Sequence, residues 1–128
     1  MSGAAALTSR KTVMVVEDDR STSDLLREIV EDQGLRCVPA SEGLTALAMA
    51  IEEHPSLITL DLDLPDTDGH RVLHRLLADE RTRDIPIVLV TGYRRYLPDT
   101  DCHRVAAVLE KPIDVDALAD LLTTLMDS

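Results

Sequence analysis

The sequence has few cysteines, few aromatic residues and no long apolar run. Cys37 and Cys102 are its only cysteines and form no metal-ligand cluster. A chain of 128 residues is long enough to bury a core without disulfides or structural zinc. No apolar run approaches the roughly 18 residues that cross a membrane, and residues 1–10 lack the apolar core of a signal peptide. We therefore expect a cytoplasmic protein with one domain over residues 11–128, preceded by a disordered tail.

Basic residues are also scarce. Lysine and arginine number 13 against 24 aspartates and glutamates, for a net charge of −11. This excess argues against direct binding of nucleic acid or of an anionic membrane by the general surface. It favours divalent cations or basic partner surfaces. No dimer face can be identified, so the oligomeric state stays open.

Short apolar runs alternate with longer amphipathic stretches along the chain. The runs at 13–16, 35–38, 57–60, 86–90 and 105–109 are expected strands, the second of them stopped by Pro39. Helical spacing marks the stretches between them, for example Leu44, Leu47, Ala48 and Ile51 in the second helix. This order predicts an α/β fold with a doubly wound, five-stranded parallel sheet and helices on both faces. Residues 93–104 contain Pro98 and no apolar stripe, so a short or irregular helix is expected there.

Polar residues gather where the predicted strands end. Ligand sites of open parallel sheets lie outside the carboxyl ends of the strands, so these residues belong together. They are Glu17, Asp18 and Asp19 after the first strand, Asp61 after the third, Thr91 and Gly92 after the fourth, and Lys111 and Pro112 after the fifth.

Several carboxylates in one place repel each other unless a cation joins them. Mg²⁺ accepts one or two carboxylates and shares phosphate oxygens, and Mn²⁺ is an alternative. Lys111 could pair with Asp61 and then with an added phosphoryl group, while Thr91 offers a hydroxyl. These are the charges that phosphoryl transfer requires, so Asp61 is the expected nucleophile and phosphoacceptor.

With these motifs, from about Lys11 to its end, the chain resembles the receiver domain of two-component response regulators. The resemblance implies that Asp61 accepts phosphate from a sensor histidine kinase or a histidine phosphotransfer protein. The chain would then catalyse only its own phosphorylation and dephosphorylation, and would not be a true enzyme. The residues that carry the resemblance are Glu17-Asp18, Leu60-Asp61 with Pro65 and Asp68-Gly69 downstream, Val90-Thr91-Gly92, and Glu110-Lys111-Pro112-Ile113.

The resemblance also assigns individual roles. Asp18 and Asp61 would bind the metal through carboxylates, Asp63 through its backbone carbonyl, and Glu17 through water. Thr91 and Lys111 would hold the phosphoryl oxygens, and Lys111–Pro112 would be a cis peptide.

Two further positions are expected to tune the lifetime of the phosphoryl group. Asp63 and Tyr93 flank the path of an attacking water in the family, and the bulk of Tyr93 is expected to shield the phosphoryl group. One departure concerns the switch: Val108 stands where receivers usually carry an aromatic residue, so an aromatic rotamer switch cannot be assumed.

Other interpretations compete with this one. A receiver-like scaffold that takes no phosphate would explain Val108. The pair Asp61 and Asp63 is similar to the aspartyl nucleophile pair of haloacid-dehalogenase-type phosphatases, but those place it after the first strand. Asp66 and Asp68 are expected to form turns rather than bind ions, and Asp19 and the four histidines are expected to be solvent-exposed.

Overall fold

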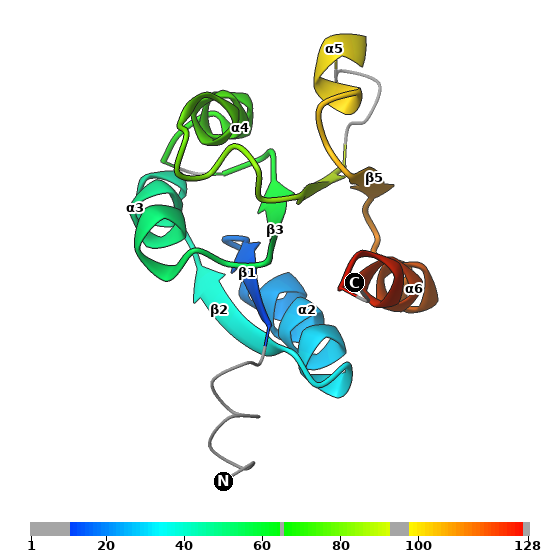
Figure 1. The fold of residues 1–128 in the computed structure, drawn as a ribbon. Helices are drawn as coiled ribbons and strands as arrows, with labels where there is room; N and C mark the ends of the chain where they lie inside the picture. The colour runs from blue at the N-terminus through cyan, green and yellow to red at the C-terminus, as the bar shows by residue number, and fades with distance from the viewer. Residues whose placement is uncertain (1–10, 65, 93–97, 127–128) are drawn as a thin grey trace, which may run out of the picture.

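Strands and helices alternate in the computed structural model, which describes residues 11–64, 66–92 and 98–126 (Figure 1). All strand pairs are parallel, and the strand order β2-β1-β3-β4-β5 reverses direction at β1, as in a doubly wound sheet. The predicted fold is confirmed. The elements are β1 (Thr12–Val16), α2 (Arg20–Asp32), β2 (Arg36–Ala40), α3 (Gly43–Glu53), β3 (Leu57–Asp61), α4 (Gly69–Ala78), β4 (Ile87–Thr91), α5 (Asp99–Cys102), β5 (Ala107–Glu110) and α6 (Val115–Met126).

The helices cover the two faces of the sheet. In Figure 1, α2 and α6 lie on one side of the strands, and α3 and α4 lie on the other. Strand β1 shows how the sequence serves both layers: Val13 and Val15 pack against α2 and α6, whereas Met14 and Val16 face α3 and α4. Every residue of β3 and β4 is buried, because both strands are covered on both faces.

The second strand differs from its prediction. Pro39 does not stop it but lies within β2, paired with Val15 of β1. Strand β2 is at the edge of the sheet, where the missing N–H of proline costs no ladder hydrogen bond. A proline is therefore tolerated there that would break an interior strand.

The buried face of α3 also differs from the expected one. Gly43, Ala46 and Ala50 face the core, while Leu44 is 63% exposed and Ala48 is exposed. Small residues let the helix lie close to its neighbours: a Cβ on Gly43 would collide with Thr67 and Val72. The larger residues Leu47 and Ile51 flank this contact and are only half-buried.

The segment before the last strand is short, as predicted. Helix α5 has four residues, and β5 begins at Ala107 rather than at Val105. The expected tail, residues 1–10, lies outside the described residues. No helix among the described residues is long and apolar enough to cross a membrane.

Candidate functional site

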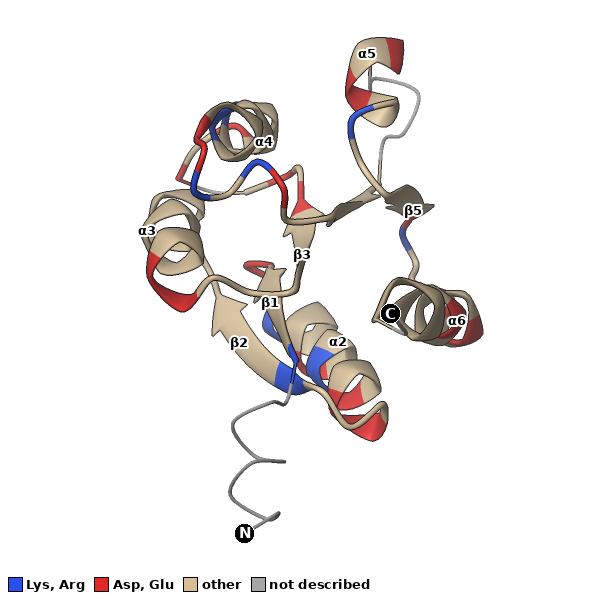
Figure 2. Ribbon diagram, in the orientation of Figure 1, with Lys and Arg blue, Asp and Glu red and all other residues tan. Residues whose placement is uncertain are grey.

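Acidic side chains lie together at the carboxyl edge of the sheet. Glu17 and Asp18 follow β1, and Asp61 is the last residue of β3, the neighbouring strand. Figure 2 shows the acidic positions after β1 and at the tip of β3. One carboxylate oxygen from each of the three residues lies within 4.8 Å of the others. Among the described residues this is the one cluster of such side chains with metal-binding spacing.

Asp61 is buried and anchored from two directions. It is 2% exposed, and the backbone N–H of Asp63 donates to its Oδ1 over 2.9 Å. Its Oδ2 lies 3.2 Å from Nζ of Lys111. The carboxylate is therefore held in one orientation by a backbone donor and a cation.

Glu17 is equally buried and has an unusual pKa. Burial, reinforced by the nearby Asp61 carboxylate, raises its pKa to about 7. The N–H of Asp19 donates to its Oε2 over 3.1 Å. Its Oε1 lies 3.2 Å from Lys111 Nζ but has no well-aligned hydrogen-bond partner. This buried carboxylate is thus incompletely satisfied by the protein alone.

Lys111 bridges the two acidic residues. Its ammonium lies 3.2 Å from Asp61 and 3.2 Å from Glu17. Partial burial by itself would lower the pKa of Lys111, but attraction to the two carboxylates outweighs burial and raises that pKa. The lysine therefore stays charged beside Asp61.

The pairing of β4 with β5 brings Lys111 to this place. Thr91 is opposite Glu110 in the register, and the N–H of Lys111 donates to the carbonyl of Thr91 over 2.9 Å. Thr91 is 2% exposed. The Lys111–Pro112 peptide is cis. The ends of β1, β3 and β5 thus bring Glu17, Asp61 and Lys111 together, and the end of β4 lies beside Lys111.

The donor set suits a hard divalent cation. Mg²⁺ prefers oxygen ligands and takes one or two carboxylates, and Asp18 is exposed beside the buried Asp61 and Glu17. The buried Oε1 of Glu17, which has no hydrogen-bond partner among the described residues, fits this donor set.

Neighbouring aspartates have structural roles that differ from one another. Asp19 is exposed and caps α2 by accepting from the N–H of Thr22 over 2.9 Å, while Asp68 caps α4 through the N–H of His70. Asp66 accepts from the N–H groups of Gly43 and Leu44, over 2.8 and 3.0 Å. It thereby caps α3 from the loop that follows Asp61, a contact across more than 20 residues that no local pattern indicates.

Comparison with known proteins decides the family. The family model of the response regulator receiver domain matches residues 13–123. This chain belongs to that family. It is a receiver domain of the kind used in two-component signalling.

Individual relatives agree with the family model. This chain is 36% identical over 107 residues to the polar-differentiation response regulator DivK of Brucella ovis. The aligned region covers 82% of this chain and 87% of the relative. A CheY-like receiver domain from Methylobacillus flagellatus has a TM-score of 0.83 at 27% identity, covering 91% of this chain and 99% of that one. The receiver domain of the sensor histidine kinase PA1611 from Pseudomonas aeruginosa, described with magnesium in its active site cleft, has a TM-score of 0.82 at 22% identity, covering 94% and 100%.

Two expected positions of this receiver need comment. Val108 is half-buried and packs on the core layer beside α3 and α4, so an aliphatic side chain occupies the place expected for an aromatic one. Tyr93, the other expected determinant of phosphoryl lifetime, lies outside the described residues. Asp63 is exposed next to the site.

The receiver also contains a polar contact that the sequence did not indicate. Asp101 of α5 is 4% exposed, and its Oδ1 lies 3.0 Å from Nε2 of His74. His70, one turn earlier on α4, lies 3.6 Å from Oδ2 and is half-buried, so the expectation of exposure is wrong for it. The sequence indicates no common partner for His70 and His74, and Asp101 lies 27 residues beyond His74. The contact ties α5 to α4.

Proposed function

We propose that Asp61 of this receiver accepts a phosphoryl group from the phosphohistidine of a sensor kinase or a phosphotransfer protein. The observation that carries this proposal is the Lys111 ammonium, 3.2 Å from Asp61 inside an acidic cluster at the strand ends. In the transfer, a carboxylate oxygen of Asp61 forms a bond to phosphorus while the phosphorus–nitrogen bond of the donor breaks. The departing imidazole nitrogen takes up a proton.

One backbone N–H and two side chains of the receiver prepare this step. The Asp63 N–H and Lys111 hold the Asp61 carboxylate in one orientation, which lowers the entropic cost of attack. The Lys111 ammonium pairs first with the Asp61 carboxylate. After transfer it pairs with the phosphoryl oxygens, to which its flexible side chain can move. The Thr91 hydroxyl donates to the same oxygens from the end of β4, which links the phosphorylated state to that strand.

The cation belongs beside these groups. Asp18 and Asp61 would bind Mg²⁺ or Mn²⁺ through carboxylates, Asp63 through its backbone carbonyl, and Glu17 through water. The bound ion supplies positive charge to the phosphoryl oxygens. Glu17 must lose its proton to take part, because its pKa is about 7.

We further propose that residues 11–128 form the receiver domain and that it works in the cytoplasm, where kinase partners present their phosphohistidines. It labels itself once per phosphoryl donor instead of turning over substrate. Asp63 and Tyr93 set how long the phosphoryl group lasts, with Tyr93 shielding it. Replacing Tyr93 by alanine is then expected to speed autodephosphorylation.

Intact mass spectrometry after incubation with acetyl phosphate and MgCl₂ tests the proposal. The wild-type receiver is expected to gain one phosphoryl group, and Asp61→Asn is expected to gain none, as is the wild type in excess chelator. No added mass on the wild type would favour a scaffold that takes no phosphate. Continuous release of phosphate from a small phosphate ester would instead favour a phosphatase.

A further inference from the structure

A cleft runs along the seam between α3 and α4, on the face of the sheet opposite α2 and α6. Its main part has a volume of about 440 Å³, with Leu47 and Ile51 on the α3 side and Arg75 and Leu76 on the α4 side. A smaller extension of about 60 Å³ continues it past Leu44, and Leu47 and Arg75 line both parts. We call this continuous feature the α3–α4 groove.

The α3 side of the groove exposes apolar surface. Leu44 is 63% exposed, the larger of the two values among exposed large hydrophobic residues in the described part of the chain. Because Gly43, Ala46 and Ala50 take the buried face of α3, the larger Leu44, Leu47 and Ile51 are left at the groove. A row of half-buried and exposed aliphatic side chains beside a cleft is typical of a docking surface.

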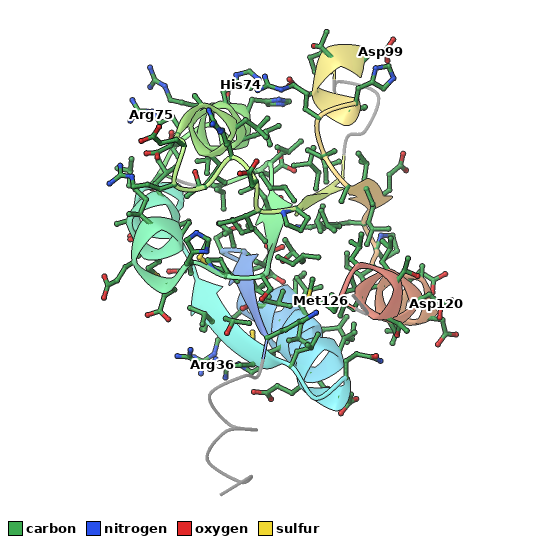
Figure 3. All side chains as sticks on the ribbon, in the orientation of Figure 1. Arg36, His74, Arg75, Asp99, Asp120 and Met126 are labelled. Carbon is green, nitrogen blue, oxygen red and sulfur yellow. The ribbon has the colours of Figure 1, made fainter. Side chains whose placement is uncertain are left out.

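The α4 side carries positive charge that the protein does not neutralise. Arg71 and Arg75 are one helical turn apart, a rise of about 6 Å, and neither forms an ion pair with another described residue. Arg81 at the far end of the groove is paired with Asp79 over 2.8 Å. Figure 3 shows Arg75 leaving α4 on the side away from α5, whereas His74 leaves it toward α5. Among the described arginines that form no ion pair with another described residue, these two are the ones that line the groove.

We propose that the α3–α4 groove binds an acidic amphipathic helix of a partner protein. The apolar face of that helix contacts Leu44, Leu47 and Ile51, and two of its carboxylates, one turn apart, pair with Arg71 and Arg75. A helix fits better than a strand because the two arginines repeat with the pitch of a helix and the seam runs between two helices. Arginine binds carboxylates through two parallel hydrogen bonds, which gives this pairing direction as well as charge.

The remaining charge of the receiver selects the kind of partner. The net negative field disfavours anionic lipid surfaces, so a membrane is a poor occupant. A peptide carboxylate close to Arg71 and Arg75 is attracted by their guanidinium groups. Repulsion from the more distant acidic residues is weaker there, because solvent screens charges beyond about 10 Å. The proposal does not depend on phosphorylation of Asp61, although Thr67 at the near end of the groove lies in the loop that follows Asp61.

Selection from a displayed library of helical peptides, each of about 16 residues, against the full-length protein tests the proposal. The peptides that bind are expected to share leucine or isoleucine on one face with glutamates or aspartates one turn apart. Fluorescence anisotropy should show that the double variant R71E/R75E weakens binding by about tenfold or more. Changing the two peptide carboxylates to arginine should restore binding to that variant.

The controls separate this groove from the rest of the surface. R83E/R104E makes the same charge change at two exposed arginines outside the groove and should leave peptide affinity unchanged. Leu44→Asp should weaken binding on its own, and it carries the test if R71E/R75E fails to fold. Asp61→Asn should bind as the wild type does, so that failure of phosphorylation and failure of docking can be told apart.

Several results would overturn the proposal. They are a lack of enriched peptides, enrichment of basic peptides, or an equal loss of affinity in R83E/R104E. Binding of anionic vesicles with no binding of peptides would assign the groove to lipid instead. A dimer that R71E/R75E converts to monomer, again without peptide binding, would assign it to a second copy of the chain.

Discussion

At the scale of single residues, the site contains two buried carboxylates whose negative charges are offset by one ammonium group. Lys111 lies 3.2 Å from both Glu17 and Asp61, so a change in any of the three alters the charge seen by the others. The strand ends could be predicted from the sequence because charged residues directly follow apolar runs. The protonation of Glu17 could not, because its pKa depends on burial and on the distance to Asp61, which only the folded structure defines.

Replacing Lys111 tests whether its ammonium speeds phosphoryl transfer to Asp61. Lys111→Ala is expected to slow phosphorylation by acetyl phosphate by about 100-fold, since one preorganised charge is lost where negative charge develops. The rate can be measured by intact mass spectrometry over time. Lys11, the only other lysine, precedes β1 and so lies at the opposite edge of the sheet from the site. Its ammonium donates a hydrogen bond to the carbonyl of Met126. Lys11→Ala should therefore keep the wild-type rate, and equal slowing in both variants would contradict the assigned role.

Glu17 links stability to pH. Its pKa is raised from 4.5 to about 7 on folding, so the folded state holds the extra proton between these values. The stability of the metal-free protein should therefore fall as pH rises through this window. Relative to Glu17→Gln, the melting temperature of the wild type should be lower at about pH 8 than at about pH 5. Parallel curves for the two proteins would show that Glu17 has an ordinary pKa.

At the scale of elements, burial on both faces made β3 and β4 predictable, whereas the apolar pattern of α3 indicated the wrong buried face. Leu44, Leu47, Ala48 and Ile51 repeat like a buried helix face, yet small residues take that place. The reason is distance: α3 lies so close to Thr67 and Val72 that only a residue without a side chain fits at Gly43. Such proximity comes from tertiary packing, which helical periodicity in the sequence does not predict.

A second close contact fixes the loop between β3 and α4. A Cβ on Gly69 would collide with the backbone of Leu62, whose carbonyl accepts from the Gly69 N–H over 3.2 Å. Gly69→Ala is therefore expected to cost about 2 kcal/mol of stability and to slow phosphorylation, because the loop directly follows Asp61. Gly92→Ala is the matched control for stability, since its Cβ would have no neighbour within 4 Å among the described residues. Equal thermal unfolding of the two variants would contradict this explanation.

At the scale of the whole molecule, the order of the strands gathers residues from both ends of the chain. Glu17 and Lys111 are 94 residues apart, yet they meet because β1 and β5 flank the pair β3 and β4 in one parallel sheet. The rule that parallel strands present their carboxyl ends at one edge is enough to predict this gathering. The contact of Asp101 with His74 has no such rule behind it, because α5 is not a regular part of the alternation.

Binding of the cation is expected to stabilise the whole fold. An ion that binds the folded state alone adds about 2.7 kcal/mol at 100 times its dissociation constant. The melting temperature of the wild type should therefore rise with MgCl₂, and the rise should be lost in Asp18→Asn. Asp24→Asn, an exposed change on α2, should keep it. A rise of equal size in all three proteins would mean that magnesium acts elsewhere.

The most direct test of the central claim is to locate the phosphoryl group. Borohydride reduces an aspartyl phosphate to homoserine, so treatment after phosphorylation marks the modified residue for peptide mass spectrometry. The account predicts homoserine at position 61, dependent on magnesium and at no other aspartate. Homoserine at Asp18 or Asp63, or none at any position after incubation with donor and magnesium, would contradict it.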